Sequence, residues 1–464
     1  MEDLLRDVTE RAIRYYASLD ARSVAPSSEA VNNLIRLREP FPQKPADPQT
    51  ILALLDEVGS PATTSSAGGR FFGFVTGGSL PAALAANWLA GAWDQNAFSF
   101  ASSPATVVLE EVALGWLLDA LALPPECGGA FVTGATMANF TALAAARNAV
   151  LAQFGWDVEA EGLFGAPEVK VVVGAEAHPT LLKALGMLGL GRKRLTTVSV
   201  DGQGRMRADA LPTLSKSEPT IVCIQAGNVN TGAFDPAAEI CAVAHETGSW
   251  VHVDGAFGLW AAASPERSHL AAGFAEADSW ATDAHKWLNV PYDSGLAFVR
   301  RPESLKAAMA ISAAYLPEGE VREPMQYTPE ASRRARGVEV WAALRSLGRE
   351  GLAELIERNC EYAARFAEGF RAAGYEVINE VVLNQVLVSF GDEEATRRVV
   401  AGVQTEGTCW CGGTVWHGRA AMRVSISSWA TTEEDVERSL EAIRRVASLE
   451  ARKKGSGANV EPGR

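Results

Sequence analysis

Residues 278–290 read DSWATDAHKWLNV, and this stretch joins a β-strand pattern to three ionisable side chains. The first residues are mostly apolar or β-branched, and Asp283, His285 and Lys286 follow within four positions. A lysine in an apolar setting is normally paired or neutralised, because burial disfavours a free charge. A single lysine in a loop is most often a surface residue. The interpretation of Lys286 therefore depends on what the rest of the chain places beside it.

Further short apolar runs resemble this one and alternate with segments of helix length. They are GAFVTG (129–134), VKVVVG (169–174), RLTTVSV (194–200), TIVCIQAG (220–227), SWVHVDG (249–255) and GLAFVR (295–300). Continuous apolar runs are typical of strands that are buried on both faces, so the pattern predicts an α/β fold with a mostly parallel sheet. Ligands in such sheets bind beyond the carboxyl ends of the strands. Polar residues at those ends are therefore candidate site residues.

The chain divides into four parts by pattern. Residues 1–60 are predicted to form a helical N-terminal arm, and residues 61–325 form the large domain that contains the sheet. Residues 326–450 combine a long helix (333–373) with strands at 376–390 and 422–427, which predicts a small C-terminal α+β domain. Residues 451–464 are polar and contain glycine, so we expect a disordered tail.

Composition excludes several classes of protein. A net charge of −14 disfavours a nucleic-acid partner, because phosphates are bound by basic surfaces. The sequence has no apolar run of about 18 residues, so no membrane span is expected. The six cysteines are scattered, and the pair in TCWC (408–411) has no second pair at ligand spacing, so we predict no metal site. Reduced thiols in a cytoplasmic protein are the expected interpretation.

Three more strand ends carry residues of chemical interest. Asp254 ends the run SWVHVD, His178 follows VKVVVG, and Gly134, Ala135 and Thr136 begin a helix after the strand at 129–133. Each feature alone is weak, because such residues are common in turns and helix caps. Amides at a helix N-terminus can bind phosphate.

Taken together, a phosphate cradle, an acid, a histidine and a lysine at one sheet edge meet the requirements of pyridoxal 5′-phosphate (PLP). Lys286 would form the Schiff base. Asp254 would keep the ring nitrogen protonated, so that the ring accepts electrons. The small residue Ala256 would let the ring lie flat, and His178 would stack on its other face.

These motifs together resemble those of a known enzyme family. Residues 65–450 resemble the group II PLP-dependent amino-acid decarboxylases, which act on aromatic amino acids, glutamate, histidine and tyrosine, in the stretches HVDGAFG, DAHKWLN, VTGATMANFTAL, SFASSPA, GAFDP and SRRARGVEVW. The resemblance implies an aspartate-aminotransferase-like fold (PLP fold type I), with a seven-stranded sheet, a small C-terminal domain and a homodimer. It also implies roles in cofactor binding for Gly134, Ala135, Thr136, His178, Asp254, Ala256, Asp283, His285 and Lys286.

The match departs from the family pattern at three places. Val229 stands where relatives have a hydroxyl near the phenolic oxygen of the cofactor, and the amide of Asn228 is expected to replace it. The segment 315–334 is shorter than the catalytic loop of the family. Tyr327 is our candidate for its protonating tyrosine, with His178 or water as alternatives, since neither Tyr315 nor Tyr327 matches that position clearly. Gly69 and Arg70 stand where relatives often have His-Pro, and Arg70 leaves a polar or acidic substrate as an alternative.

The substrate pocket is expected to be aromatic. Phe71, Phe72, Phe98 and Tyr292 fall at positions that line this pocket or the dimer edge in relatives, although each ring could instead belong to the core. Aromatic linings favour a flat or apolar substrate. The sequence therefore predicts decarboxylation of an aromatic or apolar L-amino acid to its amine. The alternatives are oxidative conversion to an aldehyde, cleavage of a Cβ bond, or a non-catalytic dimer, which the retained Lys286, Asp254 and His178 disfavour.

Overall fold

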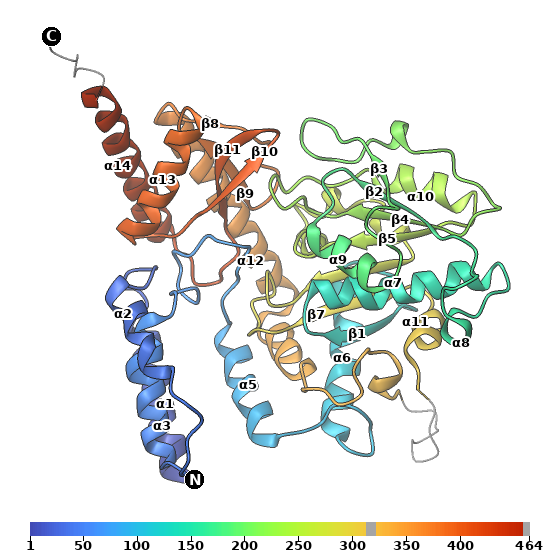
Figure 1. Cartoon of the computed structure of the whole chain (residues 1–464), viewed down its shortest axis with the longest axis horizontal. Coiled ribbons are helices and arrows are strands. Elements are labelled where there is room, and N and C mark those ends of the chain that lie inside the picture. The colour runs from blue at the N-terminus through green and yellow to red at the C-terminus, as the bar shows by residue number, and fades with distance from the viewer. Residues whose placement is uncertain (312–321, 458–464) are drawn as a thin grey trace. The chain divides into compact units, whose positions relative to one another are not determined.

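The computed structural model describes residues 1–311 and 322–457 (Figure 1). The chain forms two compact units. The larger unit comprises residues 77–363 and 379–385. The smaller unit comprises residues 1–76, 364–378 and the chain from Val386 onward.

A seven-stranded sheet forms the centre of the larger unit, with the strand order β1-β7-β6-β5-β4-β2-β3. The strands are β1 (Gly128–Val132), β2 (Lys170–Gly174), β3 (Thr196–Val198), β4 (Thr220–Gln225), β5 (Trp250–Asp254), β6 (Ser279–Asp283) and β7 (Gly295–Val299). Only β7 pairs antiparallel, with β1 and β6, and the other pairs are parallel. All seven strands coincide with predicted runs, so the predicted α/β fold with a mostly parallel sheet is confirmed.

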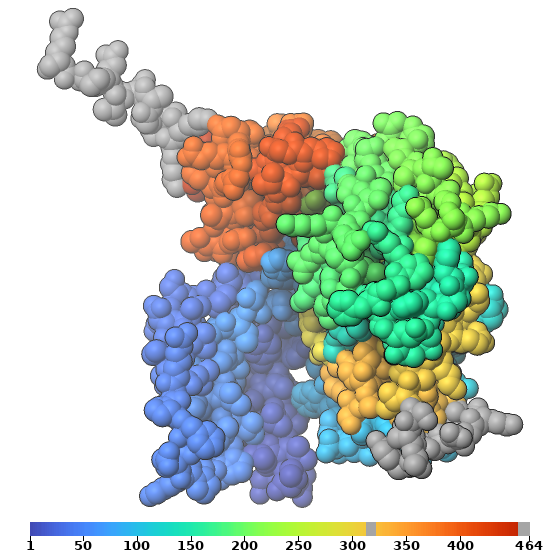
Figure 2. All heavy atoms as spheres, turned by 45° about the vertical axis from the view of Figure 1, so that its right-hand side comes forward, coloured from blue at the N-terminus to red at the C-terminus, as the bar shows by residue number. Residues whose placement is uncertain are grey.

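Helices connect and cover these strands. They are α5 (Pro81–Trp93), α6 (Pro104–Ala120), α7 (Ala135–Ala152), α8 (Val158–Glu161), α9 (Pro179–Met187), α10 (Ala237–His245), α11 (Pro302–Met309) and α12 (Gly337–Ala372), which continues past residue 363. The segments from α7 to α9, teal to green in Figure 2, form much of the visible surface over the sheet. No helix in the described part of the chain has the length and apolar character needed to cross a membrane.

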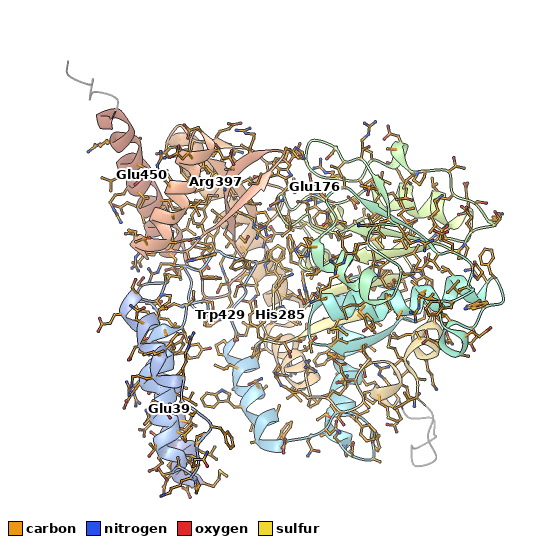
Figure 3. All side chains as sticks on the ribbon, in the orientation of Figure 1. Glu39, Glu176, His285, Arg397, Trp429 and Glu450 are labelled. Carbon is orange, nitrogen blue, oxygen red and sulfur yellow. The ribbon has the colours of Figure 1, made fainter. Side chains whose placement is uncertain are left out.

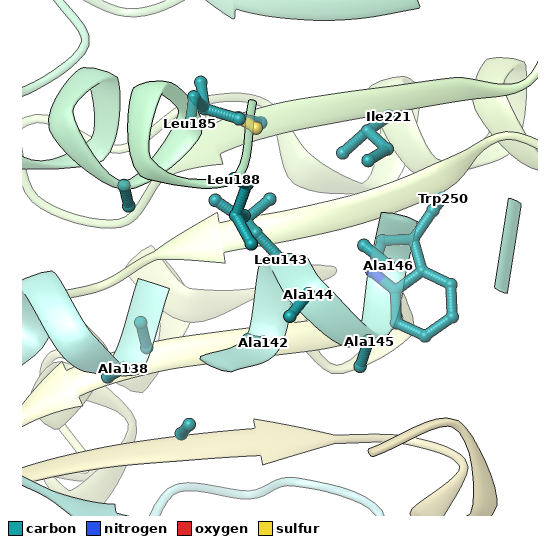
Figure 4. Packing of buried hydrophobic residues seen from close by; sticks show 14 of the residues in the cluster. Ala138, Ala142, Leu143, Ala144, Ala145, Ala146, Leu185, Leu188, Ile221 and Trp250 are labelled. Carbon is teal, nitrogen blue, oxygen red and sulfur yellow. The ribbon is translucent and has the colours of Figure 1, made fainter. Parts of the chain in front are cut away.

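Helix α7 packs closely on the sheet because its inner face is built of small residues. Ala138, Ala142 and Ala145 are fully buried, and the same cluster contains Leu185 of α9 and Trp250 of β5 (Figure 4). Alanine has high helix propensity and little bulk, so the helix axis can approach the strands. This packing fixes the position of the N-terminus of α7 at the sheet edge where the parallel strands end.

The smaller unit contains the N-terminal helices and an antiparallel module. Its helices are α1 (Glu2–Ser18), α2 (Ser28–Asn33), α3 (Pro48–Leu54), α4 (Ser60–Ala62), α13 (Glu393–Glu406) and α14 (Glu433–Gly457). Its strands, in the order β10-β11-β9-β8, are β8 (Glu376–Val377), β9 (Gln385–Ser389, which starts in the larger unit), β10 (Gly412–Trp416) and β11 (Arg419–Ser425).

Two details of this module differ from expectation. Strand β10 was not predicted, and the expected strand 376–390 is two strands, β8 and β9. The expected disordered tail is wrong for residues 451–457, which continue α14, and residues 458–464 lie outside the described part of the chain.

The expected arm shares its unit with the C-terminal module. The N–H of Phe72 donates to the carbonyl of Trp410 at 2.8 Å, and Thr431 Oγ1 donates to the carbonyl of Gly69 at 2.7 Å. The larger unit, in turn, includes residues 326–363, which we had expected in the small domain. Contacts between distant segments therefore set the units, and they differ from the four consecutive parts expected from the sequence.

Candidate active site

Lys286 lies in the turn that follows β6, and its partner is the acid at the end of that strand. Lys286 Nζ is 2.9 Å from Asp283 Oδ2. The Asp283 residue is 2% exposed, whereas the Lys286 side chain is 21% exposed. The turn is fixed because the N–H groups of Ala284 and His285 both donate to the carbonyl of Ser294. Lys286 is thus a half-buried, paired amine.

His285 points back toward the same acid, and Figure 3 labels it. Its Nε2 is 3.5 Å from Asp283 Oδ1. The N–H of Ser294 donates to His285 Nδ1 at 3.0 Å, so Nδ1 is the acceptor and the neutral ring carries its proton on Nε2. Burial lowers the pKa of His285, and this favours the neutral ring. His285 therefore presents an N–H to the site.

The N-terminus of α7 meets these residues. The N–H of Ala135 donates to Asp283 Oδ1 at 2.5 Å. Gly134 provides no side-chain cap, so the first-turn amides of Thr136 and Met137 remain open for a ligand. A Cβ on Gly295 would lie 2.4 Å from the backbone of Gly134, which shows how closely β7 approaches this turn.

Asp254 ends β5, the neighbour of β6 in the sheet. Its residue is 4% exposed, and Oδ1 accepts the N–H of Ala256 at 3.3 Å. Burial raises the pKa of Asp254, and electrostatic interactions with His178 and Lys286 act in the opposite direction. The structure therefore brings Asp254, His178 and Lys286 within electrostatic reach of one another.

His178 caps helix α9 and lines one pocket together with Asp254 and Glu176, which Figure 3 also labels. The N–H of Thr180 donates to His178 Nδ1 at 3.3 Å, and Thr180 Oγ1 is 2.6 Å from the same nitrogen. A backbone N–H can only donate, so the neutral His178 ring carries its proton on Nε2. The cap fixes the ring at the end of β2.

These residues fit PLP. The open amides at the N-terminus of α7 can hold a phosphate, since the partial positive charge of a helix N-terminus favours anions. The buried Asp254 carboxylate needs a cationic partner, which the protonated ring nitrogen would provide. Lys286 supplies the amine, and the half-buried Ala256 leaves room beside the strand end.

Asn228 has another use than the one expected from the sequence. Its Oδ1 accepts the N–H groups of Asn230 at 2.8 Å and Thr231 at 3.2 Å, and its Nδ2 donates to Glu176 Oε2 at 2.9 Å. Asn228 is 1% exposed. Both ends of the amide hold the loop after β4, so the structure gives no support to a contact with the phenolic oxygen of the cofactor.

The four predicted pocket aromatics have different environments. Phe72 is 1% exposed and packs edge-on against Phe366 at 5.1 Å, so it belongs to the core of the smaller unit. Phe71 stacks on Trp410 at 5.0 Å in that unit. In the larger unit, Phe98 is half-buried, and the 58% exposed Tyr292 lies 4.3 Å from the His285 ring. Of these four rings, Tyr292 is thus the one with a described contact to a candidate site residue.

Arg70 is fully engaged in the smaller unit. Its guanidinium donates to the carbonyls of Asp20 and Thr408 and pairs with Asp435 at 3.4 Å. Gly69 must be small, since a Cβ there would lie 2.4 Å from Asp435 Oδ2. Arg70 therefore ties segments together, which removes the reason to expect an acidic substrate side chain.

Tyr327 is not brought together with Lys286. It packs against the core cluster around β1 and α7, and the Arg322 guanidinium lies 4.1 Å above its ring. Arg322 also donates to the carbonyl of Gly129. Tyr315 lies outside the described residues.

Sequence reasoning missed two glycines that shape the site. A Cβ on Gly77 would lie 1.8 Å from the carbonyl oxygen of Lys286, and Gly295 has the close approach to Gly134 described above. The only signal in the sequence was a Gly-Gly pair (77–78) ahead of a helix and a glycine that opens a strand. Neither pattern by itself indicates a backbone contact with the turn that carries Lys286.

Comparison with known proteins agrees with this geometry. Residues 32–391 match the model of the pyridoxal-dependent decarboxylase conserved domain. The chain is 27% identical over 475 residues to tryptophan decarboxylase 1 of Oryza sativa subsp. japonica, covering 94% of this chain and 91% of the relative. It is 26% identical over 464 residues to 4-hydroxyphenylacetaldehyde synthase of Rhodiola rosea, covering 95% and 93%. The crystal structure of Oryza sativa TDC with PLP and tryptamine has a TM-score of 0.89, 24% identity and 97% coverage of both chains.

Proposed function

Since this chain belongs to the family of pyridoxal-dependent decarboxylases, we propose that it converts an aromatic L-amino acid to its amine and carbon dioxide, with Lys286 as the residue that holds the cofactor. The family makes the chain a PLP-dependent amino-acid decarboxylase, and the substrate and residue roles are the proposal. The observation that carries it is the cluster of Lys286, Asp283, Asp254 and His178 at the ends of β2, β5 and β6.

Each residue of the cluster has a distinct part in this proposal. PLP, when bound, draws electrons from the bond between the substrate Cα and its carboxylate. Asp254 holds the proton on the ring nitrogen, because a buried carboxylate favours a charged donor beside it. His178 carries its proton on Nε2 and would stack on the ring. The first-turn amides of α7 and the Nε2–H of His285 hold the phosphate.

The proposed aromatic substrate rests on two observations. The relatives above include a tryptophan decarboxylase, and Tyr292 offers an exposed ring beside His285. Arg70, the one residue that had kept an acidic substrate open, is engaged elsewhere. We expect turnover with L-tryptophan, L-tyrosine or L-phenylalanine and little with L-glutamate, measured as amine and carbon dioxide.

A second outcome, oxidative conversion to an aldehyde, is favoured by the similarity to 4-hydroxyphenylacetaldehyde synthase. The position of Tyr327 under Arg322 is compatible with it, because the structure does not pair that hydroxyl with Lys286. An assay that follows amine, aldehyde and oxygen uptake together distinguishes the two reactions.

The role of Lys286 is tested directly. Borohydride reduction of the purified protein, followed by peptide mapping, should find the pyridoxyl group on Lys286. The variant Lys286→Ala should carry no such group and should lose turnover. A pyridoxyl group on another lysine, or none in the wild-type chain, would overturn the proposal.

We also propose a homodimer in the cytoplasm. Val108, Val112 and Trp116 follow one another at four-residue spacing on α6 and are 48%, 36% and 37% exposed. Such an apolar stripe is typical of a surface that another chain covers. The free, buried cysteines support a reducing compartment.

A further inference from the structure

Asp283 occupies the first anion-binding position of helix α7. Its Oδ1 accepts the N–H of Ala135 at 2.5 Å, and its Oδ2 is 2.9 Å from Lys286 Nζ. The residue is 2% exposed, so water screens its charge poorly. The carboxylate thus uses both an amide and an ammonium that face the site.

A phosphate at the same helix N-terminus would meet this carboxylate. Both groups are acceptors that favour the same amides, and like charges at contact distance repel strongly where the effective dielectric constant is low. The neighbouring groups cannot remove this conflict entirely. Lys286 and His285 can each offer a donor, but both already face the Asp283 carboxylate, at 2.9 Å and 3.5 Å.

We propose that Asp283 competes with phosphate for the N-terminus of α7 and thereby weakens the hold of this chain on the phosphate of PLP. This inference rests on the proposed function, because it assumes that the cofactor phosphate binds at Ala135, Thr136 and Met137. It assigns to Asp283 the opposite effect from that of a simple cofactor-binding residue. The carboxylate holds Lys286 and limits phosphate affinity at the same time.

The substitution Asp283→Asn tests the competition. An asparagine keeps an oxygen for the Ala135 N–H and adds an Nδ2–H that can donate to phosphate, while it removes the charge. We expect the full chain, freed of cofactor, to bind inorganic phosphate at least about tenfold more tightly in this variant, measured by calorimetry. The affinity for PLP should rise more than the affinity for pyridoxal, which lacks the phosphate.

Asp293→Asn is the matched control. Asp293 lies in the same loop, and its substitution by asparagine changes the charge by the same amount. Its carboxylate pairs with Arg336 at 2.9 Å and not with the N-terminus of α7. Asp293→Asn should change phosphate affinity much less than Asp283→Asn does, because Asp293 acts on His285 only through space. Asp283→Ser removes the same charge with a smaller side chain, and it gives the same comparison should the asparagine variant not fold.

Unchanged or weaker phosphate binding in both Asp283 variants would overturn the competition. An equal gain in Asp293→Asn would also overturn it, because the effect would then come from net charge alone. Borohydride mapping of the wild-type chain distinguishes a failure of this inference from a failure of the proposed function. A pyridoxyl group on Lys286 without tighter phosphate binding in the variants refutes this inference and leaves the proposed function intact.

Discussion

Asp254 is a buried carboxylate that accepts a hydrogen bond from the N–H of Ala256 at 3.3 Å. Burial raises its pKa, so its charged form depends on positive neighbours. We expect Asp254→Asn to lower turnover by about 100-fold or more, because a charge-assisted hydrogen bond to the ring nitrogen is lost. Steady-state kinetics on the folded variant, with its cofactor content measured, checks this. Near-normal turnover would show that Asp254 is a structural residue.

For Tyr327, the structure and the sequence predict opposite effects of removing the hydroxyl group. The half-buried ring packs against the core cluster of the larger unit beneath Arg322, so we expect its contribution to be to packing. We expect Tyr327→Phe to leave the ratio of amine to aldehyde unchanged. Tyr327→Ala should lower stability by less than the roughly 3–5 kcal/mol lost with a fully buried aromatic side chain, because this ring is half-buried. A shift toward aldehyde in Tyr327→Phe would restore the hydroxyl as the proton donor.

The candidate site could be predicted where an ionisable residue follows the end of an apolar strand, because few structural roles explain such a residue there. Lys286, Asp254 and His178 were found because the ends of parallel strands meet at one edge, and the structure brings them together. Asn228 and Phe72 could not be interpreted in this way. Their partners, Glu176 and Phe366, lie far away in the sequence, and nothing in the local pattern reveals them.

At the scale of elements, the contact between β7 and the start of α7 supports the site. A Cβ on Gly295 would lie 2.4 Å from the backbone of Gly134, and neither partner is a flexible side chain. We expect Gly295→Ala to lower the free energy of unfolding by about 1–3 kcal/mol and to weaken PLP binding, since the amides proposed to hold the phosphate must shift. Gly202→Ala, where a Cβ has nothing within 4 Å, is the control and should change stability by less than about 0.5 kcal/mol. Equal effects of the two substitutions would contradict the close approach.

The strands of the large sheet were predictable because each is a continuous apolar run bounded by turn residues. Strand β10 was not predictable, because Gly412 and Gly413 at its start weaken the strand pattern. It exists because β11 pairs with it through a tight turn, in which His417 and Gly418 adopt φ values of 47° and 74°. The break in α12 at Gly348, with φ 61°, was also invisible in the helical pattern.

At the scale of the whole molecule, one buried histidine should make stability sensitive to acid. His252 is 0% exposed, its ring nitrogens lie 2.8 Å from Ser279 Oγ and Asn139 Oδ1, and burial lowers its pKa to about 3. The folded pKa is below the ordinary value of 6.5, so the unfolded chain takes up the proton first. This contribution to stability is therefore complete above pH 6.5 and falls by about 1.4 kcal/mol per pH unit as the pH drops toward 3.

The comparison of wild type with His252→Gln isolates this effect. Burial raises the pKa of Asp235 to about 7, so Asp235 increases the stability of the fold as the pH falls. Asp235 is present in both chains, so its contribution cancels when the two pH profiles are subtracted. We expect the stability advantage of the wild type to shrink as the pH is lowered from about 7 to about 5, measured by urea unfolding. Parallel pH profiles for the two chains would show that His252 does not titrate on unfolding.

The assembly of the whole molecule is tested on α6. Val112 is 36% exposed in the middle of the apolar stripe that it forms with Val108 and Trp116. A second copy that covers this stripe would remove apolar surface from water, which is favourable by about 25 cal/mol per Å². We expect the wild-type chain to sediment as a dimer and Val112→Glu to dissociate, because a charge would be buried without a partner. Val243→Glu places the same charge at a 43% exposed valine of α10, outside the stripe, and should remain dimeric. Sedimentation of both variants at matched concentrations tests whether α6 forms the dimer interface. A Val112→Glu chain that remains dimeric would show that the subunits contact each other through another surface.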